Sequence, residues 1–205
     1  MKLHTSIGPN PRLVNLFLAE KGVTLPKVEV DVIGGENRRP PFLAINPAGA
    51  TPVLELGDGT ALCETLAICE WIEELYPEPA LIGATAQARA VTRMWTRRVD
   101  LMVAQPMTAG FRGAEGLPLF KDRVRCLPQA ADELKLAARE GLAWLDRQLD
   151  GRPYLAGDAV SLADLLLFSF VEFGAQVGQP LDPDNRRLVA WHDRMASRPS
   201  AAATA

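Results

Sequence analysis

Cysteine and histidine, which most often carry nucleophilic or metal chemistry, are few in this 205-residue chain. The three cysteines, Cys63, Cys69 and Cys126, are odd in number and form no Cys-x-x-Cys pair. This pattern argues against both a disulfide framework and a zinc site. His4 and His192 stand near opposite ends of the chain, and a histidine-based metal site or catalytic triad would need both at once. We therefore expect none of these chemistries.

Two polar segments remain as candidate ligand-binding positions. Glu64 and Thr65 open a helical pattern, and the free N–H groups and positive dipole end of a first helical turn attract a carboxylate. Either residue could instead only cap the helix, although capping and ligand binding are compatible. The second segment, residues 6–12 (Ser-Ile-Gly-Pro-Asn-Pro-Arg), joins a predicted strand to a predicted helix. Asn10 in this segment could be a helix N-cap, its commonest use at such a junction.

The elements that must position these residues alternate between strand and helix over the first eighty residues. Strands are predicted at residues 1–5, 28–32, 52–56 and near 62, and helices around residues 13–20 and 64–76. Gly22 ends the first helix, and the turn Gly-Asp-Gly at residues 57–59 links the last two strands. With a further helix after the second strand, the order β-α-β-α-β-β-α predicts a thioredoxin-like domain.

The chain after about residue 85 is predicted to be entirely helical. A stiff proline-containing connector at residues 77–84 precedes four amphipathic or apolar helices, at residues 87–112, 134–149, from 158 onward and 184–197. Ser161 and Asp164 have the spacing of a helix-capping box, so we expect them to be structural. The sequence therefore predicts an α/β domain over residues 1–80 and an all-α domain over residues 86–205.

The composition is that of a folded protein without a nucleic-acid or membrane signature. Hydrophobic residues make up 48% and charged residues 23%, and the net charge is −3. This balance gives no overall attraction to phosphate backbones or anionic lipid. No uncharged stretch approaches the ~18 residues of a membrane span, and the first residues lack the apolar core of a signal peptide. We expect a cytoplasmic protein.

Four local patterns, taken in order along the chain, resemble the cytosolic glutathione transferase family. They are the loop at residues 6–12, the segment Asn-Pro-Ala-Gly-Ala-Thr-Pro-Val-Leu at 46–54, the helix start Glu-Thr-Leu-Ala-Ile at 64–68, and Ser-Leu-Ala-Asp at 161–164. Residues 16–22 (Leu-Phe-Leu-Ala-Glu-Lys-Gly), with Pro9 and Asn10 before them, are most similar to the bacterial Nu class. Asn10 also stands where the beta class has its cysteine.

This resemblance implies a glutathione site built on the first domain. A cis bond between Thr51 and Pro52 would turn the backbone groups of Thr51 outward, where the family pairs them with the cysteinyl backbone of glutathione. Thr65 is implied to hold the γ-glutamyl carboxylate through its hydroxyl and backbone N–H, while Glu64 accepts from the ammonium group. An ordinary trans proline at a strand start is the alternative for Pro52, and we favour the cis form.

The glycyl end of glutathione is assigned by the same resemblance. Asn37 matches a position where relatives place a polar side chain near this end, and Arg39 is close enough in sequence to help bind its carboxylate. Arg38 and Arg39 could equally be a solvated surface pair, and the sequence leaves both interpretations open.

The group that stabilises the glutathione thiolate is sought in the loop after the first strand. A free thiol titrates near ~8.5, so a transferase needs hydrogen-bond donors that favour the anion. Asn10, whose position is asparagine in the Nu class, is the first candidate; Ser6 is the second, and Thr5 the third. Cys63 and Cys69 lie outside this loop, and helical spacing places Cys69 in the core.

The resemblance implies transfer of glutathione to a hydrophobic electrophile held by the helical domain, by a homodimer that uses glutathione as co-substrate and no metal. Two alternatives stay open. The Nu-like position of Asn10 favours glutathione-dependent disulfide reduction, with a disulfide as the second substrate. Some relatives keep the fold without catalysis, which would make this chain a binding protein.

Overall fold

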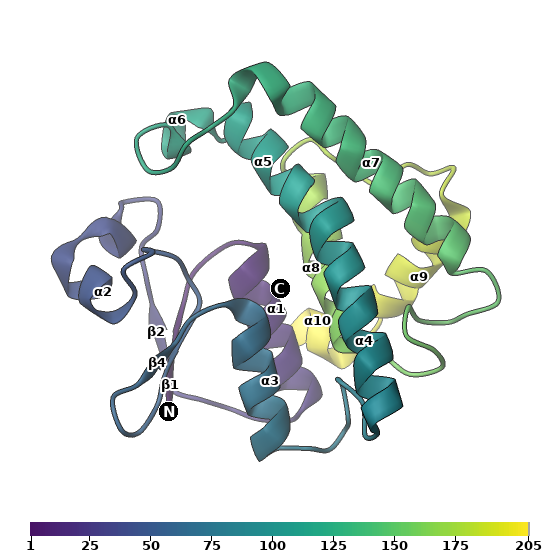
Figure 1. Ribbon diagram of the computed structural model, residues 1–205, viewed down its shortest axis with the longest axis horizontal. Coiled ribbons are helices and arrows are strands. Elements are labelled where there is room, and N and C mark those ends of the chain that lie inside the picture. The colour runs from purple at the N-terminus through teal and green to yellow at the C-terminus, as the bar shows by residue number, and fades with distance from the viewer. Residues whose placement is uncertain (205) are drawn as a thin grey trace. The chain divides into compact units, whose positions relative to one another are not determined.

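The computed structural model describes residues 1–204, which form two compact units (Figure 1). The first unit comprises Met1–Leu81 and the C-terminal residues from Pro199 onward, and the second comprises Ile82–Arg198. The sequence grouped all residues from 86 onward in one helical domain. In the structure the last helix, α10 (Pro199–Ala203), instead packs on α1 (Pro9–Glu20) of the first unit. Ser200 donates a hydrogen bond of 2.5 Å to the carboxylate of Glu20.

A four-stranded mixed sheet forms the centre of the first unit. Its strands are β1 (Lys2–Thr5), β2 (Lys27–Glu29), β3 (Val53–Glu55) and β4 (Ala61–Leu62), in the spatial order β2-β1-β3-β4. β1 and β2 are parallel, because a helix connects them, whereas β3 pairs antiparallel with β1 and with β4. The predicted element order and the thioredoxin-like arrangement are confirmed. β2 ends earlier than predicted, because the chain turns at residues 31–36.

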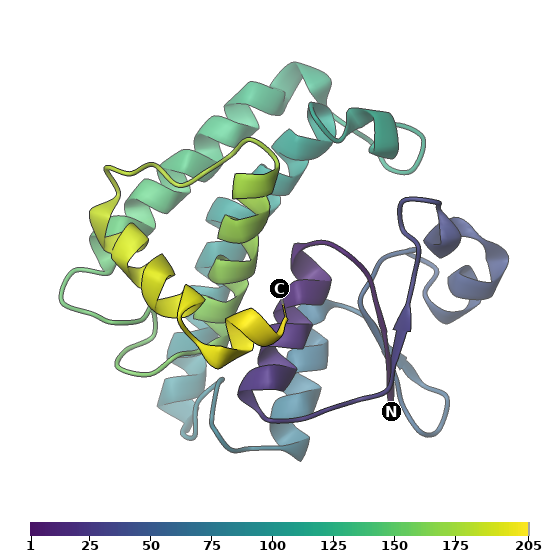
Figure 2. The same cartoon turned by 180° about the vertical axis from the view of Figure 1, so that it is seen from behind.

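Helices cover both faces of this sheet. α1 and α3 (Thr65–Leu75) lie side by side on one face, and the short α2 (Pro40–Ile45) lies on the other, after the 3₁₀ turn η1 (Glu36–Arg38) (Figures 1 and 2). Phe42 of α2 packs with Val30 and Val53 of the sheet region. Gly22 has a φ of 65°, which suits glycine and ends α1 as predicted. Cys69 is fully buried, as its helical spacing indicated.

The helical unit begins with a long helix that contains a wide π turn. α4 (Ala86–Val99) continues through η2 (Asp100–Ala104) into α5 (Gln105–Gly113), where the sequence predicted one uniform helix. Pro106 explains the difference, because it has no N–H for the carbonyl of Met102 and its ring would clash with that carbonyl in an α-helix. The opposite helix allows the bulge, since a Cβ atom on Gly141 would come within 2.2 Å of the Met102 oxygen.

Besides the apolar helix α8 (Leu162–Gln176), further helices complete this unit. They are α6 (Leu117–Phe120), the 3₁₀ turn η3 (Pro128–Ala130), α7 (Ala131–Gln148) and α9 (Arg186–Ala196). α8 lies between α4 and α9 (Figures 1 and 2). The predicted box at its start is present: Ser161 donates to Asp164 from its backbone N–H at 3.0 Å and from its hydroxyl at 2.6 Å. Among residues 1–204, no helix combines the length and apolarity that crossing a membrane requires.

Candidate functional site

The register of the sheet brings Ser6 and Thr51 together. Ser6 directly follows β1, and Thr51 lies two residues before β3. Because His4 pairs with Val53 across these antiparallel strands, the residues just after His4 lie opposite those just before Val53. The hydroxyl groups of Ser6 and Thr51 are 2.6 Å apart and share a hydrogen bond.

The same end of the sheet holds the start of α3. Leu54 pairs with Leu62 in the β3–β4 hairpin, so the residues just before β3 lie opposite those just after β4. Thr51 and Pro52 are therefore at the same end of the hairpin as Glu64 and Thr65. The Thr51–Pro52 peptide bond is cis, which confirms the form that the sequence favoured. The backbone N–H and C=O of Thr51 make no hydrogen bond with any described residue.

The first turn of α3 is uncapped and begins at a residue in an unusual conformation. Glu64, the N-cap residue, has a φ of 71° and is the one non-glycine residue with positive φ among residues 1–204. Such a conformation is unfavourable for a side chain with a Cβ atom, and it is often retained at binding sites. Glu64 does not cap the helix with its side chain, and the hydroxyl of Thr65 has no hydrogen-bond partner among the described residues. Donors and acceptors at this position are thus available to a ligand.

Asn37 is tied to the loop that precedes Pro52. It is 6% exposed, and its side-chain amide donates to the backbone oxygen of Gly49 at 2.7 Å. The Oδ1 atom of Asn37 is buried without a hydrogen-bond partner. Gly49 has a φ of 60°, and a Cβ atom there would lie 2.9 Å from the backbone oxygen of Asn37, so this close approach requires glycine. Asn37 therefore holds Gly49, which lies two residues before Thr51, in place.

Arg39 makes no hydrogen bond or ion pair with the described residues gathered at the end of the sheet. Its exposed guanidinium donates to the backbone oxygen of Gly34 at 3.1 Å. Arg38 likewise donates to a backbone oxygen, that of Ala48, at 3.3 Å. A role for Arg39 at the glycyl end of glutathione thus has no support from its contacts, and it stays a prediction.

The two candidates for thiolate stabilisation, Asn10 and Ser6, differ in exposure and in their hydrogen bonds within the protein. Asn10 is exposed in the first turn of α1, and its side chain makes no hydrogen bond with a described residue. The N-cap position belongs to Gly8, with a φ of 116°, so Asn10 does not serve as the cap. Ser6 is 9% exposed, and its hydroxyl is bonded to Thr51 and to the backbone oxygen of Ile7. Asn10 is free to donate, whereas Ser6 is held inside the protein.

The chain's own thiols are poorly suited to nucleophilic chemistry near this site. Burial, and then the charge of Glu64, raise the pKa of Cys63, which keeps it protonated at neutral pH. Burial also raises the pKa of Cys69 far above the range of a reactive thiol. Among the described residues, no group of three histidine, cysteine or acidic side chains could hold a metal ion.

Sequence reasoning missed two features of this site. The positive φ of Glu64 carried no signal, because the residue type is not one that prefers this region. The Ser6–Thr51 hydrogen bond joins residues 45 positions apart and depends on a sheet register that one sequence does not specify. A glycine at position 49, between Asn46 and Thr51, was the one visible sign of a tight backbone approach.

Comparisons with known proteins match both units. Residues 3–80 match the family model "Glutathione S-transferase, N-terminal domain", and residues 117–199 match "Glutathione S-transferase, C-terminal domain". Glutathione S-transferase 2 of Saccharomyces cerevisiae is 36% identical over 203 residues, which cover 96% of this chain and 85% of the yeast protein.

Two solved structures are similar over nearly their whole length. The crystal structure of Gtt2 from Saccharomyces cerevisiae has a TM-score of 0.93 at 32% identity and covers 100% of both chains. A glutathione S-transferase domain-containing protein from Marinobacter aquaeolei has a TM-score of 0.91 at 34% identity, covering 98% of this chain and 100% of the other. The similarity thus extends through both units.

Proposed function

Because this chain belongs to the glutathione S-transferase family, we propose that it conjugates glutathione to a hydrophobic electrophile. The observation that carries the proposal is the start of α3, where Glu64 has a φ of 71° at an uncapped helix N-terminus. Free N–H groups and the positive dipole end at this position suit the γ-glutamyl carboxylate. The free hydroxyl of Thr65 adds a donor, and the exposed carboxylate of Glu64 accepts from the ammonium group.

The rest of glutathione would bind along the neighbouring strand end. The unpaired backbone groups of Thr51 can form two hydrogen bonds with the cysteinyl backbone, as an added strand would. Asn37 holds Gly49 through its side-chain amide and, in this proposal, lies near the glycyl end of glutathione. Ser6 fixes the side chain of Thr51 through the 2.6 Å hydrogen bond. The site thus combines groups that are free to bind glutathione with residues that hold these groups in position.

Thiolate stabilisation is assigned to Asn10, with Ser6 as the second candidate. The amide of Asn10 has a free N–H group at the start of α1, where the helix dipole also favours an anion. Lowering a thiol pKa by two units requires roughly 2.7 kcal/mol, which one or two donors at a helix N-terminus supply. The thiolate would then attack the electrophilic carbon, forming the C–S bond as the leaving group departs or the double bond accepts the electron pair.

Glutathione-dependent disulfide reduction is the second candidate function. It rests on the Nu-like position of Asn10, and because the loop at residues 6–12 has no cysteine, the attacking sulfur would come from glutathione in this reaction as well. Asn10 would stabilise the thiolate in either reaction. The two functions differ in the second substrate, for which the helical unit would provide the surface.

The deciding experiment measures binding and then both activities on the purified protein. We expect calorimetry to show saturable glutathione binding, and conjugation of an aromatic halide or an activated alkene to exceed reduction of a small glutathione disulfide. The reverse ranking would support the reductase. Absence of glutathione binding would contradict both enzymatic functions and favour a binding protein with this fold.

A homodimer is part of the proposal. Exposed apolar side chains occur on a helix of each unit: Trp71 and Leu75 on α3, 39% and 46% exposed, and Met94 and Leu101 on α4 and η2, 41% and 52% exposed. Single exposed apolar residues are ordinary, but neighbouring ones on the same helix suit an interface. A closed two-fold dimer would bury the same surfaces on both copies.

A further inference from the structure

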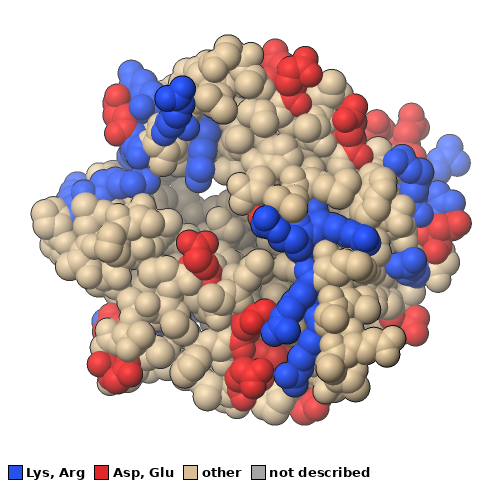
Figure 3. Space-filling model, viewed as in Figure 1, with Lys and Arg blue, Asp and Glu red and all other residues tan. Residues whose placement is uncertain are grey.

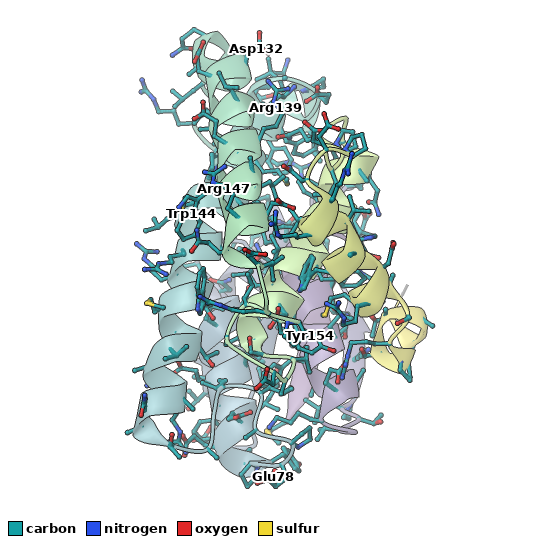
Figure 4. All side chains as sticks on the ribbon, turned by 90° about the vertical axis from the view of Figure 1, so that its right-hand side faces the viewer. Glu78, Asp132, Arg139, Trp144, Arg147 and Tyr154 are labelled. Atoms are coloured by element: carbon teal, nitrogen blue, oxygen red, sulfur yellow. The ribbon has the colours of Figure 1, made fainter. Side chains whose placement is uncertain are left out.

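Two tryptophans of the helical unit form a pair between α4 and α7. The rings of Trp95 on α4 and Trp144 on α7 are 5.8 Å apart at their centroids and tilted by 39°. Trp95 is 3% exposed, so its ring is a fixed part of the packing. Trp144 is half-buried and lies with Arg147 on the last turns of α7 (Figure 4).

Two arginines from different segments meet at this pair. The guanidinium carbon of Arg98, on α4, lies 4.7 Å from the centroid of the Trp95 ring and 5.5 Å from that of Trp144. The guanidinium of Arg152, in the loop after α7, lies 5.7 Å from the centroid of Trp95. Cation–π attraction to a buried indole thus places two cations within about 6 Å of the centre of one ring.

Neither cation has a carboxylate partner among the described residues 1–204. Arg98 and Arg152 make no hydrogen bond or ion pair with any residue among 1–204. The carboxylates next to them in sequence are engaged elsewhere. Asp100 accepts from Arg97 at 2.7 Å, and Asp150 accepts from Arg187 at 3.1 Å.

Further basic residues near the tryptophan pair add positive charge. Arg147, one turn beyond Trp144 on α7, donates to the backbone oxygen of Ala143 in its own helix. Because this acceptor is an uncharged backbone oxygen, the bond does not offset the positive charge of Arg147. Basic residues also appear over the surface of α4 in the space-filling view (Figure 3).

We propose that Arg98 and Arg152 form a binding site for the phosphoryl group of a small molecule, outside the glutathione site. The guanidinium group is planar and presents paired donors that match the oxygen atoms of a phosphate. Contacts with the indole rings hold the two groups in place in advance, and an anion that contacts both would balance their charges. Since the guanidinium groups cover the rings, a ligand would contact these donors and not the indole faces. The recognised group is therefore the phosphate oxyanion, which is present in both inorganic phosphate and a phosphate monoester.

Titration of the full-length protein tests this inference. Inorganic phosphate and adenosine monophosphate are titrated separately at low and constant ionic strength, with calorimetry and tryptophan fluorescence as readouts. We expect saturable binding of at least one of them. Tighter binding of the nucleotide assigns a monoester as the ligand, and equal or tighter binding of inorganic phosphate assigns the free ion.

Variants separate a built site from general positive charge. The double substitution Arg98→Gln with Arg152→Gln removes the two proposed donors and should weaken binding roughly tenfold or more, as expected for lost charge-assisted hydrogen bonds. Arg97→Gln removes one neighbouring charge, already paired with Asp100, and should change the affinity less than about twofold. Arg98→Lys, which keeps the charge without the paired donors, should be intermediate.

Two outcomes would overturn the inference. One is the absence of saturable phosphate or nucleotide binding by the wild-type protein, which requires no variant to fold. The other is equal weakening by Arg97→Gln and by the double substitution, which would indicate unspecific charge. Glutathione affinity, measured in parallel, should be unchanged in all variants, so failure of this site leaves the proposed transferase function untouched.

Discussion

The polar side chains at the end of the sheet fall into two groups, those bonded within the protein and those left free. Ser6 and Asn37 are buried and bonded to Thr51 and Gly49. Glu64, Thr65 and Asn10 make no side-chain hydrogen bond with a described residue. The buried, bonded residues hold the backbone of the site in place before binding, which lowers the ordering cost. The free groups are then available to contact the ligand. Substitutions in the two groups should therefore have different effects.

Thr65→Ala should weaken glutathione binding, because it removes a hydroxyl donor from the γ-glutamyl carboxylate. The expected cost is roughly 1–3 kcal/mol for a charge-assisted hydrogen bond, measured by calorimetry. Thr65→Ser keeps the hydroxyl and is the matched control, with an affinity near that of the wild type. Equal affinity of the alanine variant and the wild type would remove Thr65 from the site.

Asn10→Ala should raise the apparent pKa of bound glutathione and lower turnover at neutral pH. Its amide is the free donor in the first turn of α1, whereas Thr51, Glu64 and Thr65 would do most of the binding. Glutathione affinity should therefore be almost unchanged. The thiolate pKa is measured by ultraviolet absorbance across a pH series, alongside the rate of conjugation.

Ser6→Ala is the comparison for Asn10→Ala. Because the hydroxyl of Ser6 is already bonded to Thr51, its loss should leave the thiolate pKa close to the wild-type value. A larger pKa change in the serine variant would make this a serine-type site and contradict the assignment to Asn10. If neither substitution moves the pKa, the thiolate is held by backbone N–H groups or is not stabilised at all.

At the scale of elements, the strands and helices with strong local signals were predictable. The helices at Pro9–Glu20, Thr65–Leu75 and Ala131–Gln148 follow the apolar periodicity, and Gly22 marks one end. The π turn at Asp100–Ala104 was not predicted, because it reflects Pro106 together with the packing of another helix. The docking of α10 on α1 was missed for a related reason: five residues have too little pattern to show where they pack.

For the site, the sequence predicted features within short continuous segments better than hydrogen bonds between residues far apart in the chain. The cis bond before Pro52 and the helix start at Glu64 were placed correctly, because each belongs to a short continuous segment. The bonds of Ser6 and Asn37 cross the fold and required its register. The roles of Asn10 and Arg39, and the likeness of residues 16–22 to the Nu class, stay predictions.

Asp164→Ala should strongly destabilise the helical unit. The buried carboxylate of Asp164 accepts from Leu155 N–H at 2.9 Å, from Ser161, and from the indole of Trp191 at 3.0 Å. Alanine would leave these buried donors without an acceptor, at roughly 3–5 kcal/mol of unfolding free energy. Denaturant unfolding measures the loss. Asp158→Ala, at an exposed carboxylate shortly before the box, should change stability by less than about 0.5 kcal/mol, and similar losses in both variants would contradict the assigned role.

At the scale of the whole molecule, each unit has one face that the chain itself leaves partly uncovered. In the first unit this is the face of α3 with Trp71 and Leu75, and in the helical unit it is the face of α4 and η2 with Met94 and Leu101. A dimer that covers both faces would add buried apolar area at about 25 cal/mol per Å² before the cost of association. Assembly then depends on protein concentration and on these side chains.

We expect the wild-type protein to sediment as a homodimer at micromolar concentration. Leu101→Glu places a charge on the proposed interface and should shift the protein toward monomer, because a desolvated, unpaired carboxylate is costly. Ile33→Glu is the matched control, since Ile33 is 56% exposed against 52% for Leu101 but lies on the loop after β2. The control should remain dimeric. A monomeric wild type, or equal dissociation of both variants, would contradict the proposed interface, whereas selective loss in Leu101→Glu would assign it to α4 and η2.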